Sequence, residues 1–360
     1  MTETSYEQFS GTSPVQQRHS FDEQALKAYF SQHVDNDLAG FRVSQFRGGQ
    51  SNPTFLVEAG AQRYVVRRKP PGPLLPSAHA VDREYRVMKA LRDTEVPVPR
   101  VYALCEDDTI IGTSFYVMQY VDGRVLWDPR LPDMSATERG KIYDEMSRVI
   151  AALHGIDPAA VGLADYGRPG AYIARQVARW TRQYRDSETE RIDAMDRLIA
   201  WLPAHLPPEG PPALVHGDFR LDNVMFSHRE PRLVAVLDWE LSTVGDALAD
   251  FAYHCIAWRL PADLRGLGDL DAAQVAHDGL PSEAQYRTMY LTRRGLPEVD
   301  PSTWAFYVAF SFFRVAAIAQ GVMARALNGN ASSAHALEAG RQARRFAEMG
   351  DRQIDALHAS

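Results

Sequence analysis

The stretch LVHGDFRLDNVMF, residues 214–226, places several polar side chains inside a frame of Leu, Val, Met and Phe. Short apolar runs of this kind usually pair into a sheet, and a buried carboxylate without a partner costs several kcal/mol. Asp218 and Asn223 therefore need a partner or a ligand. The pattern predicts two short strands joined by a turn whose polar side chains carry the function of the chain.

A second carboxylate stands at the end of another apolar run, LVAVLD, where Asp238 follows Asp218 by twenty residues. The last side chain of a strand projects into the mouth of a cleft, so we expect Asp218, Asn223 and Asp238 to converge. Two oxygen ligands and a further carboxylate suit Mg²⁺ that carries phosphates, with a base beside it. The alternative is a hydrogen-bonded turn without chemistry.

Composition narrows the class of protein. The chain has 360 residues, enough for two packed units or one two-lobed domain, and it is 45% hydrophobic and 24% charged, as globular proteins are. A net charge of −7 argues against nucleic acid or an anionic membrane surface as the main partner. Cys105 and Cys255 have no metal-ligand spacing and form no disulfide framework, which fits a reducing compartment. We therefore expect a cytoplasmic protein.

Two segments bear on targeting and membranes. The N-terminus, MTETSYEQFSGTSPVQQ, lacks the basic start and the apolar run of a signal peptide. The most apolar stretch, WAFYVAFSFF (304–313), is stopped by Arg314 and is too short to span a bilayer. We expect a buried core helix in this place and no membrane partner.

Hydrophobic periodicity divides the chain into three parts. Residues 1–17 are expected to be a disordered tail, residues 18–120 contain five strand-like runs, and residues 121–360 are mostly helical. Ser20 followed by Glu23 predicts a capping box at the start of the first helix. The expected helices are about 21–34, 78–92, 136–154, 171–187 and 190–202, and the expected strands of the first part are 41–46, 54–59, 63–68, 101–107 and 114–120.

The motif HGD-x4-N followed by LDWE resembles the aminoglycoside phosphotransferase/choline kinase superfamily, whose members are relatives of protein kinases. The segment RKPPGPLLPSAHAVDREYRVMKAL favours a narrower likeness, to the kinase-like domain at the N-terminus of some acyl-CoA dehydrogenases. The likeness covers about residues 21–340. It implies an α+β, two-lobed protein-kinase-like fold, with a small five-stranded antiparallel N-lobe that has one main helix and binds nucleotide. The larger, mostly helical C-lobe would hold the catalytic and acceptor-binding residues.

The resemblance also implies roles for the residues of the motif. Asp218 would be the catalytic base that orients the acceptor hydroxyl, and His216 would brace the catalytic loop. Asn223 and Asp238 would bind Mg²⁺, with ATP as the phosphoryl donor. Asp250, in the segment GD-x3-D that follows, would support the catalytic loop through hydrogen bonds.

Two glycines between the first two expected strands offer a phosphate site, because their backbone N–H groups can approach phosphates closely. These are Gly48 and Gly49, and the side chains of Gln50, Ser51 and Asn52 are expected to help cover the phosphates. The segment departs from the full glycine pattern of protein kinases. An ordinary hairpin turn is the alternative.

Kinases carry a cation on the third strand, paired with a glutamate on the following helix. In the kinase pattern a small apolar residue over the adenine lies two positions before the cation, on the same face of the strand. Val65 and Arg67 satisfy this spacing, and Glu84 is the expected partner of Arg67. Arg68 points to the other face. Lys69 stays an alternative cation, and an arginine pair on an exposed edge strand is the reading without function.

The segment MQYVDG, residues 118–123, resembles the hinge between the lobes of kinases. There the backbone groups of Gln119 to Val121 would hydrogen-bond adenine, and Met118 would flank the nucleotide. A core methionine is the alternative for Met118. The choice between ATP and GTP stays open.

The acceptor is expected to be a small-molecule alcohol, because the segment after Asp238 is too short for the peptide-docking platform of protein kinases. In the helix expected at 171–187, arginines at 175, 179, 182 and 185 share one face and apolar residues the opposite face. An arginine face suits an anionic or acyl-CoA-linked alcohol. The alternative for the arginines is a solvated face. The alternatives for the function are an antibiotic kinase, for an aminoglycoside or macrolide, or a nucleotide-binding pseudokinase with a regulatory role. The oligomeric state stays open.

Overall fold

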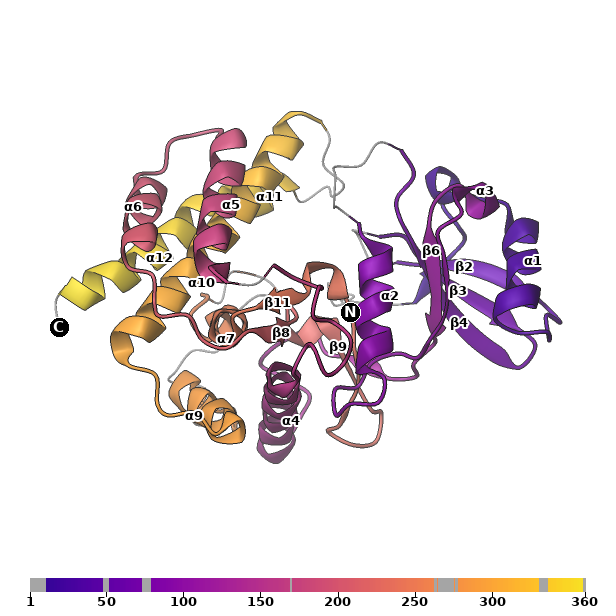
Figure 1. Ribbon diagram of the computed structural model, residues 1–360, viewed down its shortest axis with the longest axis horizontal. Helices are drawn as coiled ribbons and strands as arrows, with labels where there is room; N and C mark the ends of the chain where they lie inside the picture. Colours follow the sequence, from indigo (N-terminus) through magenta and orange to yellow (C-terminus); the bar gives the residue numbers. More distant parts are fainter. Residues whose placement is uncertain are drawn as a thin grey trace. The chain divides into compact units, whose positions relative to one another are not determined.

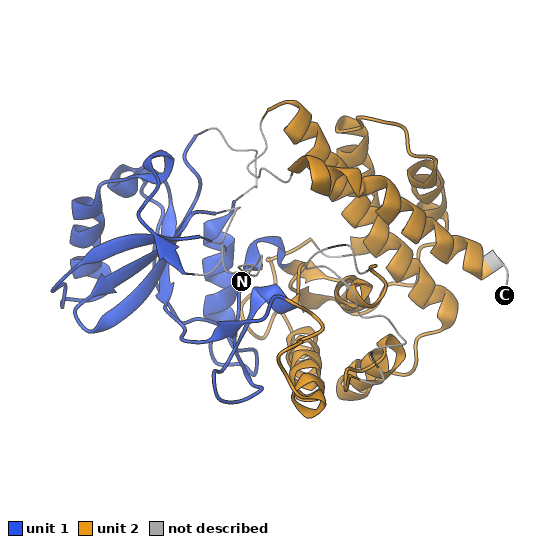
Figure 2. Cartoon of the chain, turned by 180° about the vertical axis from the view of Figure 1, so that it is seen from behind, with its two compact units in different colours: residues 1–127, 221–242 blue, residues 128–220, 243–360 orange. Residues whose placement is uncertain are grey.

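The computed structural model describes residues 11–47, 52–72, 79–168, 170–261, 264, 275, 278–329 and 336–358. The chain forms two compact units, which Figure 2 shows in different colours. Unit 1 comprises residues 1–127 and 221–242, and unit 2 comprises residues 128–220 and 243–360. The lobe boundary expected at residue 120 assigns 221–242 to the C-lobe, whereas these residues fold with the first unit.

A six-stranded antiparallel sheet forms the centre of unit 1, in the order β1-β2-β3-β4-β6-β5 (Figure 1). Its strands are β1 (Thr12–Ser13), β2 (Arg42–Phe46), β3 (Thr54–Ala59), β4 (Gln62–Arg68), β5 (Val101–Cys105) and β6 (Phe115–Gln119). All five expected strands are present. The sixth, β1, lies inside the expected tail 1–17, and the expectation of disorder is wrong for these two residues because they pair with edge strand β2.

Two helices cover opposite faces of this sheet, α1 (Glu23–His33) and α2 (Val81–Leu91), and a single turn, α3 (Asp108–Ile111), lies beside α1 (Figure 1). The capping box expected from Ser20 is wrong. Asp22 caps α1 instead, because its Oδ1 accepts the N–H groups of Gln24 at 2.8 Å and Ala25 at 3.1 Å. A 3₁₀ turn, Gln17–His19, precedes the cap.

The alternation of side chains along β4 decides what each face of the sheet carries. Tyr64 and Val66 pack in the hydrophobic cluster under α1, together with Phe30 of that helix. Val65 and Arg67 point to the face that α2 covers. Both faces of β4 are therefore buried, and the strand carries a charged side chain on the α2 face.

A small three-stranded sheet, in the order β10-β9-β7, completes unit 1. Its strands are β7 (Arg124–Val125), β9 (Val224–Phe226) and β10 (Leu233–Val236), flanked by the 3₁₀ turns Leu221–Asn223 and Trp239–Leu241. Pairing of β9 with β7 explains why residues 221–242 fold with unit 1. The ladder continues past the strand ends, since the N–H of Leu237 donates to the Asn223 carbonyl at 2.8 Å. Asn223 and Asp238 thus lie at the same end of this sheet.

Unit 2 is mostly helical and contains a two-stranded sheet, β8 (Ala213–Val215) with β11 (Thr243–Gly245). Its helices are α4 (Ala136–Gly155), α5 (Tyr172–Asp186), α6 (Asp193–Trp201), α7 (Ala247–Cys255), α9 (Glu283–Arg294), α10 (Pro301–Leu327), α11 (Ala336–Arg341) and α12 (Ala343–His358). Short 3₁₀ turns follow α6 and α7, at Leu202–Ala204 and Ile256–Trp258. The three helices expected within 136–202 are all present.

Helix α10 is longer than the sequence predicts. By its length and composition α10 could span a membrane. It is the only such helix in the part of the chain that the structure describes. The expectation that the apolar helix of this segment is too short to span a bilayer is therefore wrong. The expectation of a core helix holds, because 72% of its most apolar window is buried inside the protein, against α5, α7, α11 and α12.

The two-faced pattern expected for α5 is confirmed. Its buried residues are Ile173, Val177, Trp180 and Tyr184. On the other face, Arg179 and Arg182 are exposed, while Arg185 is bound to the carboxylates of Glu188 and Asp196 at 3.1 and 2.5 Å. Arg175 donates to the carbonyl of Arg168 at 2.7 Å.

Candidate active site

Arg67 of β4 forms a buried ion pair with Glu84 of α2. The Arg67 Nε lies 3.2 Å from Oε1 and 3.1 Å from Oε2 of Glu84, and the two side chains are 10% and 1% exposed. Because β4 and β6 pair with Arg67 opposite Tyr116, the guanidinium is fixed on the α2 face of the sheet. The structure thus brings together Arg67, which strand alternation selects, and Glu84, its expected partner.

The neighbouring cations lie elsewhere. Lys69 reaches only the exposed carboxylate of Asp82, with 4.0 Å between its Nζ and the nearer oxygen. Arg68 points to the α1 face of the sheet, where its Nη1 donates to the carbonyl of Ile111 at 3.0 Å. Of the three consecutive cations, Arg67 is the one that contacts Glu84.

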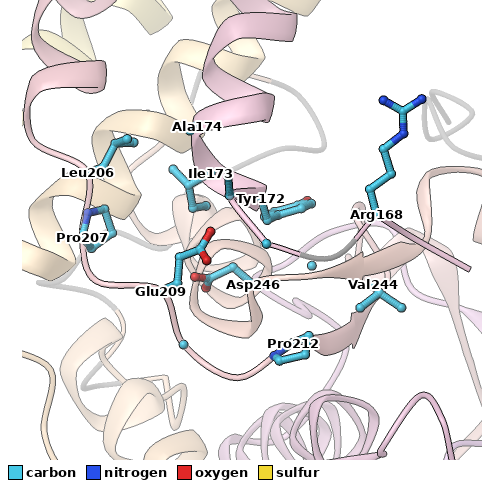
Figure 3. A pocket seen from close by; sticks show the side chains of 14 residues that line it. Arg168, Tyr172, Ile173, Ala174, Leu206, Pro207, Glu209, Pro212, Val244 and Asp246 are labelled. Atoms are coloured by element: carbon cyan, nitrogen blue, oxygen red, sulfur yellow. The ribbon is translucent and has the colours of Figure 1, made fainter. Parts of the chain in front are cut away.

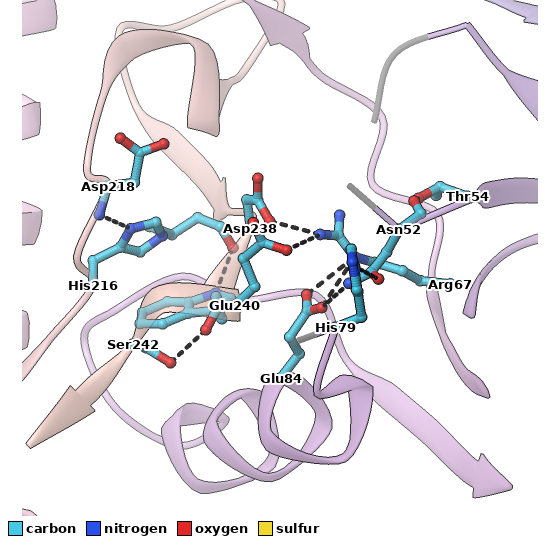
Figure 4. A network of polar contacts seen from close by, with 12 residues as sticks. Asn52, Thr54, Arg67, His79, Glu84, His216, Asp218, Asp238, Glu240 and Ser242 are labelled. Carbon is cyan, nitrogen blue, oxygen red and sulfur yellow. Dashed lines mark hydrogen bonds and ion pairs between the residues drawn. The ribbon is translucent and has the colours of Figure 1, made fainter. Parts of the chain in front are cut away.

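Two further donors bind the Glu84 carboxylate, as Figure 4 shows for Asn52. Asn52 donates through Nδ2 to Oε1 at 2.9 Å, and the Tyr116 hydroxyl donates to Oε2 at 3.2 Å. The carbonyl oxygen of the Asn52 amide accepts from Nδ1 of His79 at 2.9 Å. Burial raises the pKa of the Glu84 carboxyl to about 7, against the lowering effect of the Arg67 charge.

Asn52 therefore differs from its expected place over the phosphates. Its side chain is fully buried and both ends of the amide are engaged within unit 1. The other expected phosphate-covering residues, Gly48, Gly49, Gln50 and Ser51, lie outside the residues that the structure describes. Tyr116 and His79 are members of this cluster that sequence reasoning missed. Strand alternation could have found Tyr116, two positions from Met118 on the same face, whereas no pattern marks His79.

Asp238 lies two residues after the end of β10, with φ 62° and ψ 61°. This left-handed backbone is unfavourable for a residue with a side chain, and such conformations concentrate at functional sites. Nη2 of Arg67 donates to its Oδ1 at 2.6 Å, and Glu240 lies 3.9 Å from the same nitrogen (Figure 4). Arg67 thus bridges Glu84 and Asp238. Burial opposes the charge of Arg67, but the adjacent carboxylates outweigh it and raise the pKa of the guanidinium.

The residues expected to bind adenine differ in how available they are to a ligand. Val65 and Met118 pair directly across β4 and β6, on the face that carries Arg67, and both are buried. The backbone N–H of Gln119 already donates to the carbonyl of Arg100 at 2.7 Å, so it is a poor donor for adenine. Val121 is half-buried and follows β6.

The loop with the expected base starts at the end of β8 in unit 2. Asp250 of α7 holds it, because its Oδ2 accepts the N–H of His216 at 2.9 Å and its Oδ1 accepts the N–H of Gly217 at 2.8 Å. His154 lies 3.1 Å from the same carboxylate. Burial favours neutral Asp250, but hydrogen bonds and charges from His154 and His216 outweigh it and lower its pKa. Asp250 thus makes the hydrogen bonds expected of it, to the loop that carries Asp218.

His216 and Asp218 are joined within this loop. His216 is fully buried, and its Nδ1 accepts the N–H of Asp218 at 3.2 Å (Figure 4). Gly217 between them has φ +85°, a conformation that glycine adopts without strain. Arg220 lies 3.8 Å from the Asp218 carboxylate. Burial, followed by the charge of Asp218, raises the pKa of Tyr253 to about 12.

A pocket of about 210 Å³ opens in unit 2 where residues 206–212 face the start of α5 (Figure 3). Glu209 and Asp246 direct carboxylates toward it. Asp246 is also the N-cap of α7. The pocket is lined by the residue before β8, whereas Asp218 follows the opposite end of that strand. We therefore assign no acceptor to this pocket.

His254 stabilises the loop that carries Asp218, and this stabilisation depends on pH. Its Nδ1–H donates to the Phe219 carbonyl and its Nε2 accepts from the Tyr286 hydroxyl, both at 2.9 Å, so the ring is neutral. Burial lowers its pKa to about 4. The unfolded chain therefore binds the extra proton between about pH 6.5 and 4, and the contribution of His254 to stability declines as the pH falls below 6.5.

We expect wild-type protein to lose about 1 kcal/mol of unfolding free energy through His254 between pH 7.5 and 5.5. Urea unfolding at both pH values, compared with His254→Gln, measures this loss, because other groups titrate equally in the two proteins. The variant should show the smaller pH effect. Equal pH effects in both proteins would contradict the assignment.

The strand-rich unit with its buried Arg67–Glu84 pair, and the helical unit with its loop-borne Asp218, define the class of a kinase-like phosphotransferase fold. The chain belongs to the phosphotransferase enzyme family, which matches residues 42–288. The resemblance drawn from HGD-x4-N and LDWE is thereby confirmed, together with the α+β kinase-like fold.

The relatives of this chain include proteins that are more than twice as long. The chain is 47% identical over 342 residues to acyl-CoA dehydrogenase family member 10 of Mus musculus, covering 94% of this chain and 32% of the relative. It is 41% identical over 329 residues to acyl-CoA dehydrogenase family member 11 of Homo sapiens, covering 90% of this chain and 42% of that protein. The chain thus spans less than half the length of these relatives.

Solved structures agree with the fold. A crystal structure from Ralstonia eutropha, provisionally named an aminoglycoside phosphotransferase, is 52% identical with a TM-score of 0.84, covering 94% of this chain and 99% of the other. The aminoglycoside phosphotransferase APH(4)-Ia, in a ternary complex with ADP and hygromycin B, is 16% identical with a TM-score of 0.59, covering 92% and 98%. The latter supports the fold alone.

Proposed function

We propose that the protein is a small-molecule kinase that transfers the γ-phosphate of ATP to a hydroxyl group. The observation that carries the proposal is the buried Arg67, which bridges Glu84 and Asp238. A cation held on the third strand by a helical glutamate is the arrangement that positions nucleotide phosphates in kinases.

The residues of the loop supply the acceptor side of the reaction. Asp218 orients the attacking hydroxyl and takes its proton, while Asp250 holds the backbone before it and His216 accepts its own N–H. Phosphoryl transfer depends mainly on positioning and on neutralising charge, so a rigid loop is suited to it. Arg67 grips the phosphates with a planar fork, where relatives of protein kinases usually have lysine.

The residues of unit 1 fit Mg²⁺. Asp238 and Asn223 offer a carboxylate and an amide oxygen, which are the hard donors that this ion prefers. No cluster of three or more His, Cys, Asp or Glu side chains suited to a metal occurs among the described residues. Mg²⁺ usually keeps waters and phosphate oxygens as ligands, so two protein ligands suffice. When bound, the ion neutralises phosphate charge.

Asp238→Ala should weaken the magnesium dependence of nucleotide binding. Because the carboxylate supplies much of the charge that attracts the ion, we expect a loss of about tenfold or more in affinity for ATP with magnesium. Calorimetric titration with ATP, with and without magnesium, measures it. Glu230→Ala, which removes an exposed carboxylate from the β9–β10 turn, is the control. If magnesium strengthens ATP binding equally in all three proteins, Asp238 is not a ligand.

An anionic alcohol, such as a hydroxyacyl-CoA, is the acceptor class that we propose. Arg179 and Arg182 lie on the exposed face of α5, opposite the apolar residues that the helix buries. A cationic aminoglycoside would be repelled by this face. The names of the relatives, acyl-CoA dehydrogenase family members 10 and 11, point the same way.

ADP release from magnesium–ATP tests the proposal, measured with a hydroxyacyl-CoA, an aminoglycoside, a macrolide or water as acceptor. Mass spectrometry of the acceptor shows whether it gains a phosphoryl group. Transfer to the hydroxyacyl-CoA supports both parts of the proposal, and transfer to an antibiotic overturns the acceptor class. Nucleotide binding without transfer to any acceptor would identify a pseudokinase.

A further inference from the structure

Arg314 is a charged residue in the middle of the apolar helix α10. Its side chain is buried, with 9% of the residue exposed. Among the residues that the structure describes, no carboxylate lies within 4.0 Å of its guanidinium, and its Nε has no hydrogen-bond partner. A buried charge without a counterion is strongly destabilising. The presence of arginine at this position needs a reason other than packing.

The guanidinium contacts the catalytic loop directly. Nη2 of Arg314 donates to the carbonyl of Gly217 at 2.7 Å, and Gly217 is the residue before Asp218. Its central carbon lies 4.2 Å from the ring centroid of Tyr253 and 5.5 Å from that of Trp180. Cation–π contacts of this kind are stronger in a desolvated place, and they hold a guanidinium in one orientation.

Tyr253 links the same guanidinium to the base. Burial and the charge of the Asp218 carboxylate raise the pKa of the Tyr253 hydroxyl, and the Tyr253 ring lies against the Arg314 guanidinium. Arg314 therefore acts on Asp218 through the peptide group before it, and it packs on a tyrosine that senses the Asp218 carboxylate. In the same loop, Asp250 accepts the backbone N–H groups of His216 and Gly217.

We infer that Arg314 is a positioning residue for phosphotransfer, which fixes the loop before Asp218 and the Tyr253 side chain so that the Asp218 carboxylate faces the acceptor hydroxyl. The inference rests on the proposed function. Replacement of a buried ion by a hydrophobic side chain of similar size is often neutral or stabilising. Arg314→Met should therefore keep the fold but lower kcat. Replacing a residue needed only for folding would not lower kcat without also lowering stability.

The test compares Arg314→Met with Arg314→Lys, Tyr253→Phe and the control Arg325→Met, which removes an exposed arginine from the same helix. ADP release from magnesium–ATP is measured with the best acceptor of the panel above, or with water. For Arg314→Met we expect kcat to fall about tenfold or more, with the KM for magnesium–ATP and the thermal midpoint little changed. Lysine should recover part of kcat, because its ammonium group can still donate to the Gly217 carbonyl. Arg325→Met should resemble the wild type.

Amide hydrogen exchange at His216 and Gly217 gives a readout that needs no turnover. Their exchange should be about tenfold faster in Arg314→Met and near wild type in Arg325→Met, because the loop opens locally. Unchanged exchange, or unchanged kcat in a wild type that turns over, overturns the inference. A wild type without turnover overturns the proposed function instead. In that case exchange still decides whether Arg314 holds the loop.

Discussion

Asp218→Asn should lower phosphotransfer by about 10²-fold or more while leaving the affinity for magnesium–ATP close to that of the wild type. Asparagine matches the shape of aspartate, but it cannot take a proton from the acceptor hydroxyl. In the proposed function the nucleotide is held by residues of unit 1, to which Asp218 does not belong. Only the chemical step should therefore suffer.

Single-turnover kinetics and calorimetry with magnesium–ATP separate these two effects. Asp222→Asn, four residues further along the same loop, makes the same chemical change and should keep most of the rate. A variant at Asp218 that kept more than about a tenth of the wild-type rate would lie outside the range for a positioned general base. Asp218 would then have no part in proton transfer.

Local patterns predicted much of unit 1. Strand alternation placed Val65 and Arg67 on one face of β4 and Arg68 on the other, and the structure agrees because the sheet is buried on both faces. Alternation is set by the backbone itself, so it survives without knowledge of what packs against the strand. The β3 bounds at 54–59 were predicted to the residue for the same reason.

Contacts between distant segments could not be predicted. The Arg314 side chain meets the Gly217 carbonyl across 97 residues, and only the packing of α10 against α7 and the loop creates that contact. The turn of Asn52 toward Glu84 depends likewise on where α2 docks on the sheet. At the start of α1, by contrast, two capping residues compete locally. Asp22 prevails because its carboxylate reaches the first N–H groups of the helix.

The largest structural loss is expected from Arg67→Ala, because removing one partner of a buried pair leaves the other charge without compensation, at a cost of about 3–5 kcal/mol. Thermal unfolding should show this cost, and nucleotide affinity or kcat should fall about tenfold to a hundredfold with the loss of charge-assisted contacts to phosphate. Arg67→Lys keeps the charge but not the two-point geometry, so it should recover only part of both losses. Because lysine preserves a charged partner for Glu84, Arg67→Lys can still be measured if Arg67→Ala does not fold.

Glu84→Gln tests the pair from its other side. The glutamine side chain keeps the shape of glutamate and one carbonyl oxygen, which can accept from Asn52 or from Tyr116, but it gives up the charge that holds the guanidinium. Its effect on magnesium–ATP affinity should add poorly to that of Arg67→Ala, since both changes break one unit. Additive losses in the double variant would mean that the two residues act separately.

Lys69→Ala is the matched control, because Lys69 lies just past the end of the same strand and meets only the exposed Asp82. Arg68 is unsuitable for this purpose, since it is 2% exposed and its removal would disturb the packing under α1. We expect Lys69→Ala to keep nucleotide affinity and turnover near those of the wild type. A damaging Lys69→Ala beside a silent Arg67→Ala would reverse the assignment. Lys69 would then be the phosphate-binding cation, and the Arg67–Glu84 pair would serve only to hold α2 on the sheet.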